Sequence, residues 1–160
     1  MAIINVSASD EAVLFLGDSA ANANIAGTDG LSVPSMQDIT LNNSTGVFRF
    51  KTLDDTAERA VTTPATNQIT LNVVVDDAAF FGTGAAVDAV VSTGLFGCSK
   101  NKTRVYFNAG FQGTDTGSKY LSGSGFISGL APTVNMDSPV WVTPVTIEVD
   151  GDFANASVGA

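Results

Sequence analysis

The residue types that carry out most enzyme chemistry are scarce in this chain. There is no histidine among its 160 residues, which removes the commonest general base and the commonest zinc ligand. Cys98 is the single cysteine, and no histidine is available to activate its thiolate. We therefore interpret Cys98 as an inert small residue in a Gly-Cys-Ser turn, and a disulfide framework within the chain is excluded.

The acidic residues form adjacent pairs rather than shared carboxylate sites. Neighbouring residues on a strand point to opposite faces, so neither Asp54-Asp55 nor Asp76-Asp77 makes a paired acid site. Asp76-Asp77 is better explained as the start of a helix. Asp150-Gly151-Asp152 has the first ligands of a calcium loop but lacks the later ligands and the closing glutamate. We expect no catalytic residue, no metal site and no cofactor.

The Gly-Ser-Gly-Phe segment at 123–126 is not a nucleotide-binding loop, because no helix follows it. Glycine within a strand usually marks a bulge or a close backbone approach. The segment belongs to the stretch 120–151, which is typical of a strand, a polar break with Asp137, and a second strand rich in β-branched residues. A hairpin without chemistry indicates a building block rather than an enzyme.

Upstream of this stretch the pattern predicts a hairpin and a long loop. Met36–Leu41 and Val47–Lys51 flank a run of turn residues at 42–46, which predicts a hairpin with its tip there. Leu53–Asn67 is polar and has no clear period, so we interpret it as a loop. Connections of that length are usually functional or mobile, and the sequence leaves both interpretations open.

The middle and the end of the chain predict further strands and one helix. Gln68–Val75 alternates clearly and is the most definite strand. A helix is expected to begin near Gly84 after a Thr83 cap and to end at Gly94 or Gly97, and its apolar stripe is Val87, Val90 and Val91. Thr103–Phe111 resumes strand character, whereas the residues from about 152 are expected to fray.

Together these elements predict one mainly β domain over residues 1–160. We expect a β-sandwich or a partly closed β-barrel with one packed α-helix. Charged residues make up only 14% of the chain, against roughly 25% in a typical soluble domain. Such a composition fits either a neutral surface of Ser, Thr and Asn or a large subunit interface.

The net charge of −9 argues against nucleic-acid binding, which needs a basic footprint, and against adhesion to an anionic membrane. No segment approaches the ~20 consecutive apolar residues that a membrane span requires. We therefore expect neither a membrane nor specifically bound DNA among the partners.

The stretch 120–151 resembles the C-terminal end of bacteriophage tail tube (major tail) proteins. The residues that carry the resemblance are Gly-Ser-Gly-Phe-Ile-Ser at 123–128, Asp137, and the closing strand Val-Thr-Pro-Val-Thr-Ile-Glu-Val-Asp-Gly at 142–151. The resemblance implies a structural virion protein whose copies form rings, hexameric in that family, with inner sheets joined edge to edge around a lumen. The rings would stack into a tube that conducts DNA, and an acidic lumen would let the DNA slide.

The resemblance also implies partners, a location and an interface. The first partner is a further copy of the chain, with tail sheath, baseplate or tail terminator proteins as additional ones; the location is the virion tail after assembly in the host cytoplasm. The loop 53–67 would reach a neighbouring subunit or the next ring. The expected interface residues are Leu53, Asp54, Asp55, Glu58, Arg59, Phe126 and Trp141.

Two other classes of function remain open. A capsid decoration or head-completion protein would bind an existing shell without stacking on itself. A carbohydrate-binding or adhesin β-sandwich would need an exposed aromatic platform, whereas the pattern predicts that most of the ten phenylalanines are buried.

Overall fold

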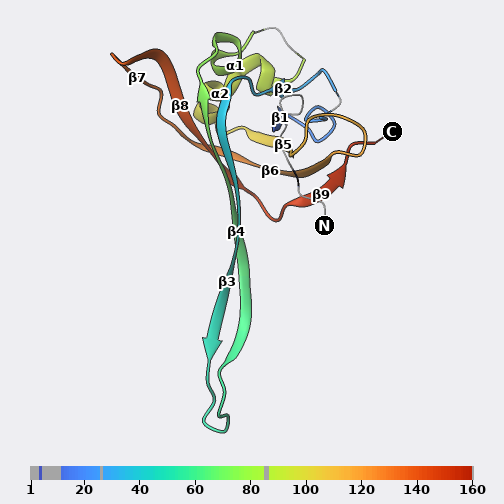
Figure 1. Ribbon diagram of the computed structural model, residues 1–160, viewed down its shortest axis with the longest axis vertical. Helices are drawn as coiled ribbons and strands as arrows, with labels where there is room; N and C mark the ends of the chain where they lie inside the picture. Colours follow the sequence, from blue (N-terminus) through green and yellow to red (C-terminus); the bar gives the residue numbers. More distant parts are fainter. Residues whose placement is uncertain (1–3, 5–11, 26, 85–86, 160) are drawn as a thin grey trace.

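The computed structural model describes residue 4 and residues 12–25, 27–84 and 87–159. In these ranges nine strands form one open antiparallel sheet, and two short helices pack on one of its faces (Figure 1). The prediction of a mainly β fold is confirmed. The strands form a single sheet rather than two packed layers. The structure has two helices, whereas the sequence predicts one.

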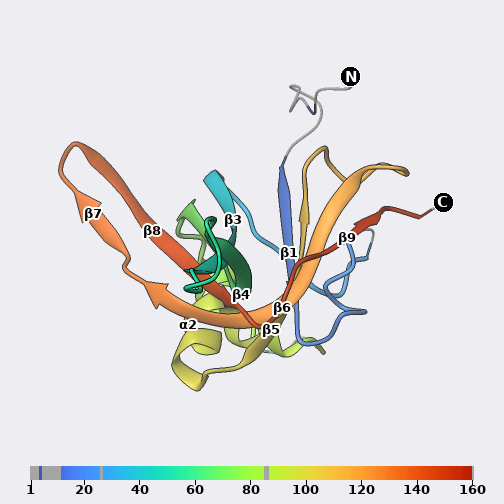
Figure 2. The same ribbon diagram turned by 90° about the horizontal axis from the view of Figure 1, so that it is seen from below.

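Some neighbouring strands of the sheet are consecutive in the sequence, and others are far apart in it. The elements are β1 (Val13–Gly17), β2 (Leu31–Ser32), β3 (Met36–Phe50), β4 (Arg59–Val74), α1 (Asp77–Phe81), α2 (Ala89–Asn101), β5 (Arg104–Gly110), β6 (Lys119–Leu130), β7 (Thr133–Asn135), β8 (Ser138–Val149) and β9 (Ala154–Ser157). The sheet order is β2-β1-β5-β6-β8-β4-β3, with β7 paired to β8 and β9 paired to β6. Figure 2 shows β8 and β6 sweeping past the helices in one curve.

One face of the sheet is buried and the other is polar. Along β4, Ile69, Leu71 and Val73 are buried, while the residues between them are half-buried. The register pairs Ile69 with Ile147 and Leu71 with Val145 on β8, so two strands deliver their apolar residues to the same side. The core also includes Leu14, Leu16, Phe80, Val90, Leu95, Cys98, Val105, Phe107 and Ile127. Each such side chain contributes roughly 1.5–3 kcal/mol by burial.

The stretch 120–151 contains two paired strands, as the sequence predicts. β6 and β8 pair from Gly125 opposite Val149 to Leu130 opposite Val145. Gly125 is buried, and a Cβ there would collide with the backbone carbonyl of Glu148. The close backbone approach expected from the Gly-Ser-Gly-Phe segment is therefore confirmed.

Aspartate side chains begin both helices. Asp76 accepts a hydrogen bond from the Ala79 N–H at 3.0 Å, which confirms the predicted helix start. Asp88 caps α2 by accepting from the N–H groups of Val90 and Val91 at 2.8 and 3.1 Å. The expected Thr83 cap is wrong, because Thr83 lies before the turn that Asp88 caps.

The helix also runs further than predicted. α2 passes through Gly94, whose φ of +69° interrupts the regular helix, and continues to Asn101. Cys98 is therefore a buried helical residue rather than part of a turn.

A reciprocal pair of hydrogen bonds joins the end of β1 to the start of α2. The Asp18 N–H donates to Asp88 Oδ2 at 2.9 Å, and the Ala89 N–H donates to Asp18 Oδ2 at 3.1 Å. The Ala89 N–H, together with the Asn22 amide, holds the pKa of Asp18 below its ordinary value. Two segments about 70 residues apart in sequence are thus held together by backbone donors and carboxylates.

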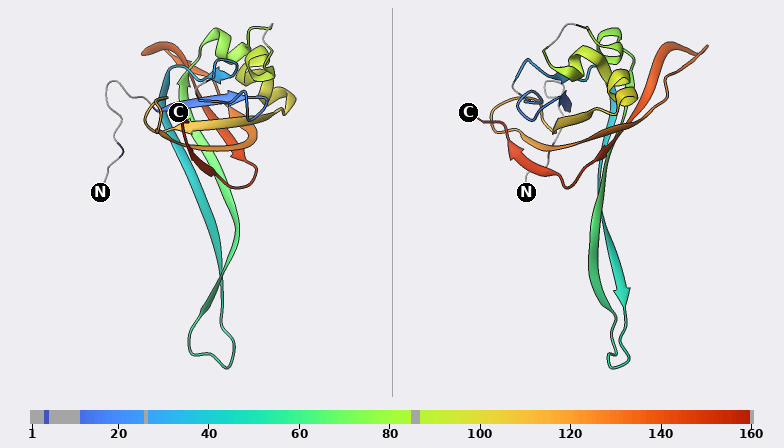
Figure 3. Two further views of the ribbon diagram at one scale, coloured as in Figure 1. Left: turned by 90° about the vertical axis from the view of Figure 1, so that its right-hand side faces the viewer. Right: turned by 180° about the vertical axis from the view of Figure 1, so that it is seen from behind.

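β3 and β4 form a long hairpin whose outer half leaves the sheet. β4 pairs with β8 only as far as Asn67, which lies opposite Asn43 on β3. We call residues 43–67 the arm. At ~3.4 Å per residue, its paired part projects about 27 Å beyond the sheet, as Figures 1 and 3 show.

The arm overturns two expectations about this region. β3 does not turn at 42–46 but continues to Phe50, with an irregularity between Thr45 and Val47. The loop predicted at 53–67 is wrong beyond residue 58, because β4 begins at Arg59. The first error arises because the run Asn-Asn-Ser-Thr-Gly at 42–46 has the composition of a turn. The second arises because neither face of the arm is buried, so residues 59–66 of β4 carry no alternation of apolar and polar residues.

The C-terminal segment is ordered rather than frayed. β9 pairs with β6 from Lys119 opposite Ser157 to Ser122 opposite Ala154, and Val158 is buried. The prediction of fraying from about 152 is therefore wrong. Backbone hydrogen bonds hold this strand, and small residues supply them as well as large ones do.

Candidate functional site

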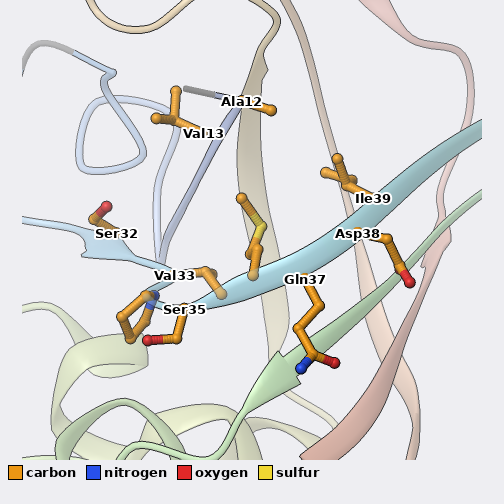
Figure 4. A pocket seen from close by; sticks show the side chains of 10 residues that line it. Ala12, Val13, Ser32, Val33, Ser35, Gln37, Asp38 and Ile39 are labelled. Carbon is orange, nitrogen blue, oxygen red and sulfur yellow. The ribbon is translucent and has the colours of Figure 1, made fainter. Parts of the chain in front are cut away.

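The hollows of the surface offer little chemistry. A cavity of about 560 Å³ lies between β1 and the start of β3; it is lined by Ala12, Val13, Ser32, Val33, Pro34, Ser35, Met36, Gln37, Asp38 and Ile39 (Figure 4). Asp38 alone among them is ionisable, and its carboxylate accepts from the Asn72 amide at 2.8 Å. It therefore helps to hold β3 against β4.

Metal-binding and membrane-spanning features are not found in the described ranges. No group of three or more His, Cys, Asp or Glu residues there could hold a metal ion. Neither helix is long and apolar enough to cross a membrane. Burial raises the pKa of the Cys98 thiol, which disfavours its nucleophilic thiolate.

The arm exposes apolar side chains along its length. Phe48 is 60% exposed, Leu53 is fully exposed, and Val47, Phe50 and Val61 are exposed as well. The rings of Phe48 and Phe50 stack with their centroids 6.1 Å apart, and Val61 lies opposite Phe48 in the register. Apolar residues grouped on a surface mark sites of interaction. Within its own chain the arm buries almost none of them.

The tip of the arm gathers five of the predicted interface residues. Leu53, Asp54, Asp55, Glu58 and Arg59 all lie at the turn or at the first residue of β4. Arg59 Nε donates to Asp55 Oδ2 at 2.6 Å and so bridges the turn. This pair is partly exposed and contributes at most about 1 kcal/mol. Contact of these residues with another subunit stays a prediction.

The structure places the other two predicted residues elsewhere. Phe126 lies on the polar side of the sheet, with the Arg104 guanidinium 5.1 Å from its ring centroid. Trp141 is exposed at the base of a second projection formed by β7 and the outer end of β8. We call residues 131–141 the wing. It also exposes Val134, Met136 and Val140, and it projects sideways from the body (Figures 1 and 3).

The sheet face opposite the core is polar and carries an acidic excess. Arg104 Nη1 donates to Asp150 Oδ2 at 2.6 Å and to Ser124 Oγ at 3.1 Å, while the Gln68 amide donates to Glu148 at 2.7 Å. We call this surface the polar face. It comprises Asp38, Gln68, Asn72, Arg104, Ser124, Phe126, Ser128, Glu148 and Asp150. Three carboxylates and one guanidinium thus share it.

Two exposed phenylalanines meet where the helices pack together. Phe81 at the end of α1 is 60% exposed, and Phe96 on α2 is 48% exposed. Both rings lie on the buried Phe80, at centroid distances of 4.9 and 5.9 Å, and are 6.5 Å from each other. We call Phe81 and Phe96 the aromatic patch.

Gly94 fixes the position of this aromatic patch. A Cβ at Gly94 would lie 2.5 Å from the backbone atoms Gly82 N and Phe80 O, and its φ of +69° disfavours other residues. Only glycine lets the end of α1 approach α2 so closely.

Sequence reasoning missed most of the exposed aromatic residues. The expectation that most of the ten phenylalanines are buried is wrong, because only Phe80 and Phe107 are buried. Five are at least 37% exposed: Phe48, Phe50, Phe81, Phe96 and Phe126. One available signal was the Phe80-Phe81 pair, because adjacent residues of a helix cannot both face the sheet. These aromatics lie on the arm, the helices and the polar face rather than on one platform.

Comparison with known proteins gives a likeness of fold. No protein-family model matches the chain, and no curated protein matches it. A chain of the SPP1 tail tube superposes with a TM-score of 0.63 and 10% identity, over 98% of this chain and 80% of that one. A chain from the virion of the native gene transfer agent particle superposes with a TM-score of 0.60 and 9% identity, over 89% of this chain and 95% of that one.

A third structure extends the same likeness. A chain from the tail of the empty gene transfer agent particle, which was refined with C6 symmetry, gives a TM-score of 0.56 and 8% identity, over 89% of this chain and 95% of that one. At such identities the likeness shows the fold. The resemblance to tail tube proteins found in residues 120–151 is confirmed at that level, and it extends over nearly the whole chain.

Proposed function

We propose that this chain is the structural subunit of a tail tube. Copies form rings, hexameric like the C6 tail of the gene transfer agent particle, and the rings stack around a lumen that conducts DNA. The observation that carries the proposal is a tail-tube fold from which an apolar arm projects without a partner. The role is structural, and the chemistry of the exposed surfaces is that of contact between subunits.

The arm has the properties of a segment that is completed by assembly. An isolated two-stranded hairpin is marginally stable in water, and this one adds exposed Phe48, Phe50 and Leu53 side chains. Covering those side chains removes apolar area from water, which stabilises the contact by about 25 cal/mol per Å². A second copy of the chain is always available at the site of assembly, so it is the simplest partner.

The polar face suits the wall of the lumen. Its one cation, Arg104, is already paired with Asp150 at 2.6 Å, while Asp38 and Glu148 remain as carboxylates held by amides. Duplex DNA carries one negative charge per ~1.7 Å of axis. Such a surface repels the DNA backbone slightly and lets it slide, whereas a basic surface would retain it.

Ring formation also protects the edges of the open sheet. β3 and β2 end the strand order, and no strand of the described residues pairs with their outer edges. An exposed edge invites uncontrolled pairing with other chains. Joining the edges of neighbouring copies around a ring pairs their backbone groups in one defined way.

The same proposal places the protein in the virion tail after assembly in the host cytoplasm. Tail sheath, baseplate or tail terminator proteins would meet the tube at its outer wall and its ends. DNA would pass through the lumen without specific binding.

Imaging the purified protein tests this function. We expect negative-stain electron microscopy to show rings or tubes with a central channel, and light scattering to show a mass far above 16.4 kDa. A strictly monomeric protein at high concentration contradicts the proposal. A variant in which Asn-Gly, a two-residue hairpin turn, replaces residues 46–64 between the paired Thr45 and Ala65 should keep the circular dichroism of the body but form no tubes.

A further inference from the structure

We propose that the arm of one copy docks on the aromatic patch of the next copy, so that rings stack head to tail through Phe48, Phe50 and Leu53 against Phe81 and Phe96. This inference rests on the proposed tube function and names the contact between rings. It assigns a receptor to the arm and a partner to an exposed aromatic surface of the helices.

The shape of the molecule places the two surfaces at opposite ends. In Figure 1, which has the longest axis vertical, the arm reaches the lower end while α1 and α2 lie near the upper end. Both views of Figure 3 show the same separation. A copy displaced along this axis therefore presents its helices to the arm of the copy above. Such a contact joins two different surfaces and repeats without closing on itself.

The two surfaces match in chemistry. Each presents two phenylalanine rings that are already stacked or in contact within its own chain, at 6.1 Å on the arm and 6.5 Å on the patch. Each is exposed on the isolated chain, with Phe48 and Phe81 both at 60%. Aromatic rings pair favourably in offset or edge-to-face arrangements, and burying these four rings together removes two apolar patches from water at once.

Charges beside the rings complement each other as well. On the helices, Asp77 precedes Phe81 by four residues and Lys100 follows Phe96 by four, so each charge lies on the same side as its ring. On the arm, Lys51 follows Phe50 and Asp54 follows Leu53. Both surfaces thus carry acids and bases near their apolar residues; at the arm tip Asp55 is already paired with Arg59, whereas Asp54 can meet Lys100 across the contact.

The wing is the competing receptor. It exposes Met136 fully and Trp141 by about half. It rises to about the height of the helices in Figure 1, but it lies well to one side of the arm and the helices, as Figure 2 shows. That position suits contact between neighbours within a ring.

Photo-crosslinking from the arm tip identifies the receptor without assuming it. Leu53 is replaced by p-benzoylphenylalanine, which the fold tolerates because the Leu53 side chain is fully exposed. The assembled protein is irradiated, and the joined peptides are identified by mass spectrometry. We expect a bond to residues 77–101 of another copy. A bond to the wing or to the polar face in normal tubes overturns the inference but leaves the tube function intact.

A pair of variants tests the same contact through assembly. The double variant Phe81→Ser, Phe96→Ser should still form rings but lose tubes and the crosslink. The control Val87→Ser, at a fully exposed apolar residue just before α2 that is not part of the aromatic patch, should stack rings like the parent. Tubes of normal length from the double variant overturn the inference. Thermal denaturation of both variants confirms that each is folded.

Charge exchange adds a readout that a folding defect does not reproduce. Lys100→Glu alone should raise the protein concentration needed for tubes severalfold, and Asp54→Lys in the same chain should restore it. Absence of rescue overturns the proposed charge pairing. If the parent protein forms neither rings nor a crosslink between copies, the result contradicts both the proposed tube function and this inference.

Discussion

The body and the arm are built from the same two strands, yet their residues depend on different surroundings. In the body half of β4, buried and half-buried residues alternate strictly from Asn67 to Val74. In the arm half almost every residue of both strands is exposed. Packing specifies the body, whereas hydrogen bonds between two strands and a few cross-strand contacts specify the arm.

This difference indicates a division of tasks within one hairpin. A residue in the body stabilises the fold whether or not other copies are present. An apolar residue in the arm contributes little to the isolated chain and has its effect when it is covered by something else. Substitutions of similar size should therefore change unfolding in one half and assembly in the other.

The largest effect is expected from truncating a buried residue of the body. Ile147 is completely buried opposite Ile69, so Ile147→Ala should lower the free energy of unfolding by about 2–5 kcal/mol. The matched change on the arm, Val61→Ala, should stay within about 0.5 kcal/mol. Urea denaturation of dilute protein measures both. Equal losses would erase the distinction between body and arm.

A substitution at Gly94 should come next, because it strains the backbone beneath the aromatic patch. Gly94→Ala places a methyl group 2.5 Å from two backbone atoms at a positive φ, and we expect a loss of about 1–3 kcal/mol. Gly84→Ala, also at a positive φ but in open space, is the control and should cost less. Thermal denaturation distinguishes the two, and a larger loss at Gly84 would contradict the role of close packing.

The junction between the two regions should show an intermediate effect. The buried Asn67 amide donates to the Gly151 carbonyl at 2.8 Å, while its Oδ1 has no hydrogen-bond partner among the residues that the structure describes. Asn67→Ala should therefore cost only about 1 kcal/mol, but it should speed hydrogen exchange of the arm amides. Asn43→Ala, at the exposed position opposite, should change neither. Unchanged exchange in Asn67→Ala would show that the junction does not anchor the arm.

A smaller effect should appear as a pH dependence of the body. The pKa of Asp18 is lowered in the fold, chiefly by the Ala89 N–H. Its contribution is therefore present above the ordinary aspartate pKa of about 3.9 and is lost as the pH falls through the lower folded value. Asp18→Asn should be less stable than the parent at pH 6, and the gap should shrink on acidification. A stability difference between the two proteins that grows at low pH would contradict a lowered pKa of Asp18 in the folded state.

The smallest effect on stability is expected from the arm aromatics themselves. Phe48→Ser with Phe50→Ser should leave the unfolding free energy within about 0.5 kcal/mol of the parent, while tube formation is lost. Sedimentation of the assembled protein and urea denaturation of the dilute protein give the two readouts. A large loss of stability with normal tubes would invert the comparison.

The same difference explains what sequence reasoning could predict. The strand at Gln68–Val75 was found because its buried half carries a period of two. The continuation from Arg59 to Asn67 was missed because no buried face imposes a pattern on it. β9 was missed for a related reason, since its residues, Ala-Asn-Ala-Ser, are small and polar.

The candidate site divides in the same way. The tip residues Leu53 to Arg59 were singled out because a long polar connection is often functional, and the structure does bring them together. Phe48 and Phe50 belong to Val47–Lys51, which the sequence predicts as one strand of a hairpin, and nothing in that pattern indicates that the hairpin projects beyond the sheet. The aromatic patch depends on Gly94, whose positive φ lets two helices meet. The Phe80-Phe81 pair indicates that one of its rings faces away from the sheet, but no local pattern predicts that Phe96 lies beside it.

The different ends of the molecule have a consequence for any filament it builds. A chain that offers an arm at one end and its receptor at the other gives the polymer a direction, because every copy points the same way. It gives no length, because each added ring presents the same free end as the one before. The two tips of such a filament are chemically unlike, one showing arms and the other aromatic rings. The length of the filament must therefore be set by a different molecule that binds one tip and prevents the addition of further rings.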